Sequence, residues 1–99
     1  MSYQYAFLET AQREYEDAIE WYQQRSQQAA ENFVLEIQKA LDLICSNPQR
    51  WRNEYNNYHE LGLKKYPHSI VYIIEPEKQR VLITAVFHGK RNPVKKYKK

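Results

Sequence analysis

The sequence is poor in cysteine, glycine and proline, and each shortage excludes something. Cys45 is the one cysteine among 99 residues, so no intramolecular disulfide can form. Two glycines and four prolines leave little room for long flexible linkers. No apolar run approaches the ~18 residues that span a bilayer. The start, "MSYQYAFLE", lacks the basic and then apolar pattern of a signal peptide. We therefore expect one cytoplasmic domain over residues 1–99, with no contact to a membrane.

Metal ligands are scarce as well. His59, His68 and His88 show no close ligand spacing. Cys45 lies in "LDLICSNP", a setting typical of a helix interior, where a thiol acts as a small hydrophobe. The sequence therefore predicts neither a metal site nor a cofactor.

Carboxylates are absent from the end of the chain, "FHGKRNPVKKYKK", which holds six Lys or Arg residues from position 87 onwards. Residues 9–47 show the opposite bias, with eight acids against three bases, although the formal net charge of the whole chain is only +3. Such a division indicates two surfaces with different partners, one of which could be a polyanion. The acidic part is interpreted as a solvated face or a dimer contact, and residues 92–99 as a short basic tail.

Two amphipathic helices are predicted in the first half of the chain. Apolar residues recur at intervals of three and four from Leu8 to Tyr22, which favours a helix from Glu9 to about Arg25. Ser26 is placed to cap a second helix, whose apolar stripe runs from Ala30 to Ile44. That helix should end at "SNP", because a proline disfavours helical geometry in the residue before it. The short break between them predicts an antiparallel helical hairpin.

The strands are indicated by alternation and by β-branched residues. "YQYAFL" alternates at the start of the chain, and "HELGLKKY" alternates after a polar, aromatic loop, "QRWRNEYNNY". "SIVYII" and "VLITAVF" are nearly continuous apolar runs joined by "EPEKQ", a hairpin turn, so they should be the central strands. The predicted class is α+β in the order β-α-α-β-β-β, with the hairpin on one face of a small, mainly antiparallel sheet. The other face should be left partly open for binding.

This order of elements, with "LKKYPHSIVYII" and "VLITAVFHGKRNP" at these spacings, resembles the RelE/ParE superfamily of bacterial toxins over nearly the whole chain. The resemblance implies the toxin half of a type II toxin–antitoxin module, growth inhibition, and a cognate antitoxin that wraps the toxin. It also implies one of two targets. RelE-like members cleave messenger RNA on the ribosome without a metal, whereas ParE-like members poison DNA gyrase.

The RelE-like alternative would be an endoribonuclease and would need a base, an acid and cations around the scissile phosphate. By resemblance, Arg91 and Tyr97 match an Arg and a Tyr that follow the last strand in those nucleases, and His88 titrates in a useful range. His88 and Tyr97 are equally compatible with packing or capping roles. An Arg of those nucleases corresponds to Ser69 here, and their paired lysines fall near Glu60 and Gly62.

The ParE-like alternative needs no catalytic group, only a surface that engages gyrase or its complex with cleaved DNA. The "YP" before the third predicted strand and "HGKRNP" after the fourth resemble this branch. The target-binding residues are then Lys90, Arg91, Lys95 and Lys96, which would attract phosphate or an acidic protein surface. The sequence analysis therefore favours a ParE-like gyrase poison.

Other possibilities remain open at this level. The chain could be a non-toxic, degenerate relative that retains antitoxin binding, or a small basic module that binds nucleic acid. Partners on the toxin interpretation are the antitoxin and either gyrase or the ribosome with its mRNA. A homodimer or a toxin–antitoxin hetero-oligomer would be compatible with the sequence.

Overall fold

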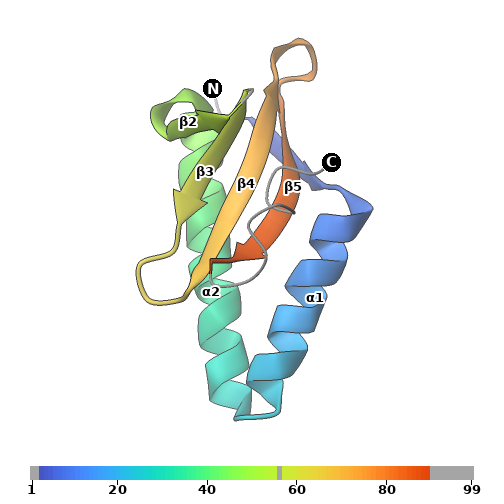
Figure 1. Cartoon of the computed structure of the whole chain (residues 1–99), viewed down its shortest axis with the longest axis vertical. Helices are drawn as coiled ribbons and strands as arrows, with labels where there is room; N and C mark the ends of the chain where they lie inside the picture. The colour runs from blue at the N-terminus through green and yellow to red at the C-terminus, as the bar shows by residue number, and fades with distance from the viewer. Residues whose placement is uncertain (1–2, 56, 90–99) are drawn as a thin grey trace.

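A helical hairpin packs on one face of a five-stranded mixed sheet (Figure 1). The structure is a computed structural model that describes residues 3–55 and 57–89, with the backbone alone for residues 52–55. The elements follow in chain order: β1 (Gln4–Phe7), α1 (Glu9–Gln23), α2 (Gln27–Ser46), β2 (Arg52–Tyr55), β3 (Tyr58–Gly62), β4 (His68–Glu75) and β5 (Arg80–His88). The predicted class and order are confirmed, with one strand more than expected.

The two helices form as their apolar periodicity predicts. α1 begins at Glu9 and ends at Gln23, slightly earlier than expected. At the start of α2, the hydroxyl of Ser26 accepts a hydrogen bond of 2.9 Å from the backbone N–H of Ala29, so the predicted N-cap is confirmed. α2 ends at Ser46, directly before Asn47 and Pro48. Within the described residues, neither helix has the length and apolarity needed to cross a bilayer.

The sheet has the strand order β1-β5-β4-β3-β2. β1 pairs with β5 in parallel, and the remaining pairs are antiparallel, so the sheet is mainly antiparallel as expected. β4 and β5 occupy interior positions, and every residue from Val81 to Phe87 is buried. This burial on both faces explains why their sequences are continuously apolar rather than alternating.

β2 corrects the prediction of a loop between α2 and β3. Residues 52–55 were assigned to that loop, but they pair with β3 at the edge of the sheet, with a register shift between Asn53 and Tyr55. β3 is also shorter than "HELGLKKY" suggested. It ends at Gly62, and Lys64 and Lys65 lie in the following connection, both exposed. The alternation that would have turned these two lysines to opposite faces therefore does not apply.

The main core lies between the hairpin and the sheet. Buried side chains of both helices meet buried side chains of β4 and β5 there. Cys45 is buried, as expected, and burial followed by the nearby Asp42 raises the pKa of its thiol. Trp51 packs against this core from its edge, as predicted, with the Arg50 guanidinium 4.8 Å from its ring centroid. The opposite face is less open than expected, because Val71, Ala85 and Phe87 form a second buried cluster there.

Candidate functional site

The end of β5 is the part of the predicted site that the structure describes. His88 is its last residue, and Gly89 follows with its backbone N–H donating to the carbonyl of Pro67 at 2.7 Å. A Cβ on Gly89 would lie 3.3 Å from the same carbonyl, so a side chain there would crowd the contact. The predicted residues Lys90, Arg91, Lys95, Lys96 and Tyr97 lie outside the described residues. Their roles remain predictions.

His88 faces the helical side of the sheet. It pairs across the strands with His68, and the two imidazole rings lie 5.1 Å apart in a T-shaped arrangement. His68 is buried at 8% exposure and also contacts the ring of Phe33, with a centroid distance of 5.1 Å. The packing role considered for His88 therefore has a structural basis, and its catalytic role stays a prediction.

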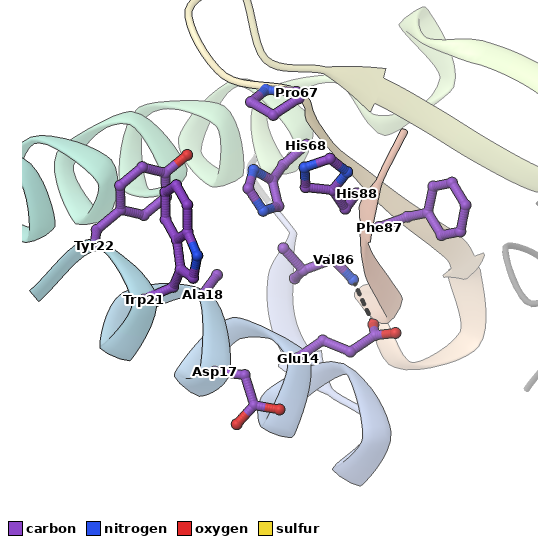
Figure 2. A pocket seen from close by; sticks show the side chains of 10 residues that line it. All are labelled: Glu14, Asp17, Ala18, Trp21, Tyr22, Pro67, His68, Val86, Phe87 and His88. Atoms are coloured by element: carbon purple, nitrogen blue, oxygen red, sulfur yellow. Dashed lines mark hydrogen bonds between the residues drawn. The ribbon is translucent and has the colours of Figure 1, made fainter. Parts of the chain in front are cut away.

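A pocket of about 440 Å³ opens beside these histidines, between α1 and the end of β5 (Figure 2). Its lining residues come from three separate segments: Glu14, Asp17, Ala18, Trp21 and Tyr22 of α1; Pro67 and His68; and Val86, Phe87 and His88 of β5. The volume falls in the range of sites that bind small molecules or single side chains.

The α1 wall of the pocket combines two carboxylates with an aromatic surface. Glu14, Asp17, Ala18 and Trp21 follow the spacing of one helix face. Trp21 is 47% exposed, which is high for a tryptophan, and its ring lies 4.9 Å from that of Tyr22 in a T-shaped contact. The guanidinium of Arg25 lies 3.8 Å from the Trp21 ring centroid. The tryptophan thus already binds one cation of its own chain.

Glu14 connects α1 to the sheet. Its Oε1 atom accepts a hydrogen bond of 2.9 Å from the backbone N–H of Val86, drawn as the dashed line in Figure 2. The need for this contact follows from the topology, because the pairing of β1 with β5 ends at Phe7 and Ile83. Beyond that point the β1-side edge of β5 has no neighbouring strand, and a side chain takes the place of one.

The opposite face of the sheet brings together the positions at which RelE-like nucleases carry cations. Gly62 pairs with Ser69, and Glu60 pairs with Val71 in the neighbouring row. Directly paired residues of adjacent strands point to the same face. Val71 belongs to the cluster on the face away from the helices, so Glu60, Gly62 and Ser69 lie on that face too. The register proposed from the sequence is therefore consistent with the sheet.

The pocket was missed by the sequence analysis, which treated the acids of α1 as a solvated face. The available signal was weak: a tryptophan four and seven residues after two acids, outside the apolar stripe that forms the core. The histidines and the β5 edge that complete the pocket are more than forty residues away in the sequence. Periodicity within one helix does not show which distant residues it will face.

Comparisons with known proteins agree with this fold. A family model described as "ParE toxin of type II toxin-antitoxin system, parDE" matches residues 5–93. No curated protein sequence matches significantly. Among solved structures, a chain of the chromosomal ParDE toxin–antitoxin system from P. aeruginosa is similar with a TM-score of 0.73 and 12% identity, covering 88% of this chain and 96% of that one.

RelE structures from E. coli are similar as well. A chain of the intact RelBE toxin–antitoxin complex aligns with a TM-score of 0.61 and 18% identity, over 91% of this chain and 100% of that one. The isolated RelE toxin aligns with a TM-score of 0.61 and 18% identity, over 96% and 93% of the two chains. Identities this low support the shared fold, whereas the family match extends over most of the sequence. The chain therefore belongs to the ParE toxin family of type II toxin–antitoxin systems.

Proposed function

We propose that this toxin arrests growth by poisoning DNA gyrase and that a cognate antitoxin neutralises it. Gyrase poisoning is the role that the resemblance to ParE-like toxins implies. The antitoxin follows from the family and from its structural relatives, which come from ParDE and RelBE toxin–antitoxin systems.

The observation that carries the choice of target is the chemistry of the sheet face away from the helices. A metal-free ribonuclease must stabilise the charge that develops on the phosphate, and the RelE-like pattern does so with cations at three positions of this face. Here those positions are Glu60, Gly62 and Ser69. A carboxylate at the first would repel the phosphate. A gyrase poison needs no such cations.

His88 supports the same choice. A general acid must reach the leaving oxygen, so it must lie on the face that holds the phosphate. His88 instead lines the pocket on the helical side, beside His68. Ribosome-dependent mRNA cleavage therefore remains the second candidate, and it would depend on Arg91 and Tyr97.

The proposal is tested by inducing the toxin alone in a bacterial host and following labelled thymidine and labelled methionine during the first minutes. We expect thymidine incorporation to fail first, together with a DNA-damage response. Purified toxin should then increase cleaved plasmid DNA in reactions with purified gyrase. Earlier failure of methionine incorporation, with mRNA cleaved on purified ribosomes, would contradict the proposal and support the ribonuclease. Absence of growth arrest would identify a non-toxic relative.

A further inference from the structure

We propose that the pocket between α1 and β5 receives an arginine side chain of the antitoxin. The inference rests on the proposed neutralisation by an antitoxin and names the chemistry of one of its contacts. It is carried by the charge and shape of the pocket walls.

The described walls of the pocket attract a cation. Glu14 and Asp17 place two carboxylates on its α1 side, and its ten described lining residues include neither Lys nor Arg. Arg25, which stacks on Trp21, is not among them. The cation already held by Trp21 therefore does not fill the pocket.

A guanidinium fits these walls better than an ammonium. Its planar group can stack on aromatic rings and at the same time donate several hydrogen bonds in its plane. Trp21 and Tyr22 supply aromatic surface, and Asp17 supplies a carboxylate. In a strand, the N–H and C=O of one residue point to the same edge. Since the N–H of Val86 meets Glu14, its carbonyl also faces this side and adds an acceptor.

Among possible partners, the antitoxin agrees best with these charges. A nucleic acid is repelled by a pocket with two carboxylates, so the DNA of a gyrase complex is not the occupant. The pocket adjoins the end of β5, after which the chain continues into its basic segment. An antitoxin that covers this segment with carboxylates passes beside the pocket. One arginine placed among those carboxylates would fix the register of the bound antitoxin.

The first test measures the pocket directly, with N-acetyl-L-argininamide as the probe and Trp21 fluorescence as the signal, in a Trp51→Phe background. We expect saturable binding that weakens with salt and is about fivefold tighter than that of the neutral isostere N-acetyl-L-citrullinamide. Asp17→Asn should remove most of this preference. Glu20→Gln is the matched control, because it removes one carboxylate from the same helix outside the pocket lining. Equal binding of both probes, or equal effects of the two variants, would overturn the proposal.

The second test identifies the occupant, with the antitoxin encoded by the reading frame next to the toxin. Asp17→Lys should leave the toxin active but raise the antitoxin dose needed for growth about tenfold, a loss of roughly 1.4 kcal/mol. Glu20→Lys should not. Full neutralisation of Asp17→Lys would overturn the proposal. Removal of residues 90–99 should leave the affinity for the argininamide unchanged, and a several-fold increase would assign the pocket to the chain's own basic segment instead. The fluorescence test requires no toxicity, so failure of the gyrase proposal would leave its result unaffected.

Discussion

Tyr72 shows how one side chain can join the sheet to the connection after α2. Its ring is fully buried, and its hydroxyl donates a hydrogen bond of 2.6 Å to the carbonyl of Pro48. His59 stacks on the ring with centroids 5.2 Å apart, and its Nδ1 atom lies 2.9 Å from the carbonyl of Trp51. Since Trp51 and Pro48 belong to the same connection, this pair of strand residues holds it against the sheet at two points.

Burial of Tyr72 also predicts how stability depends on pH. Desolvation raises the pKa of its hydroxyl strongly, with a smaller contribution from Cys45. The thiol of Cys45 is shifted upward as well, chiefly by burial. In the unfolded chain these groups ionise near their ordinary pKa values of 9.0 and 10.0, while the folded protein keeps them protonated. The unfolded state therefore binds fewer protons above pH 9, and the free energy of unfolding should fall as pH rises.

Urea denaturation at pH 7, 9, 10 and 10.5 measures this effect. The free energy of unfolding should be constant up to about pH 8.5 and then decline. In Tyr72→Phe it should be lower at pH 7 by about 1–2 kcal/mol, because the carbonyl of Pro48 loses its donor. Its decline in alkali should be shallower than that of the wild type. Tyr5→Phe, at a position 40% exposed, is the control. A decline equally steep in Tyr72→Phe would contradict the assignment to Tyr72.

At the scale of elements, sequence patterns predicted what forms through its own apolar face and missed what forms through a neighbour. The helices were predictable because their stripes and the Ser26 cap are local signals. The central strands were predictable because they are apolar throughout. β2 has no apolar alternation, and its residues become a strand only by pairing with β3. The pocket was missed for a similar reason, since its walls meet only in the folded chain.

The turn before β3 gives this dependence a test. Asn57, the described residue between β2 and β3, has a φ of 71°, in the left-handed region that asparagine and glycine tolerate and β-branched residues avoid. Asn57→Gly should therefore change the free energy of unfolding by less than ~0.5 kcal/mol. Asn57→Val should lower it by about 1–2 kcal/mol and speed amide exchange in β3. Equal stability of both variants would show that this turn does not direct the pairing.

At the scale of the whole molecule, the division of charge seen in the sequence becomes a division between two neighbouring regions. The acids of α1 line the pocket beside the end of β5, and the basic segment begins directly after it. β5 is buried along most of its length, and Gly89 is held to Pro67. The first basic residues therefore follow a firmly held point, which is why function is expected at Lys90 and Arg91 rather than at the last lysines.

Arg91 is the residue on which this argument depends under either target. Arg91→Ala should relieve growth arrest without lowering the melting temperature, because Arg91 lies beyond the last strand and a surface cation contributes little to stability. Arg91→Lys should retain part of the toxicity, since it keeps the charge but loses the two parallel hydrogen bonds that a guanidinium gives to a phosphate or carboxylate. Lys99→Ala, at the end of the same basic segment, is the matched control and should remain toxic. Toxicity is measured as colony formation after induction, and folding by thermal denaturation of each purified variant. A fully toxic Arg91→Ala protein would show that the target contact lies elsewhere.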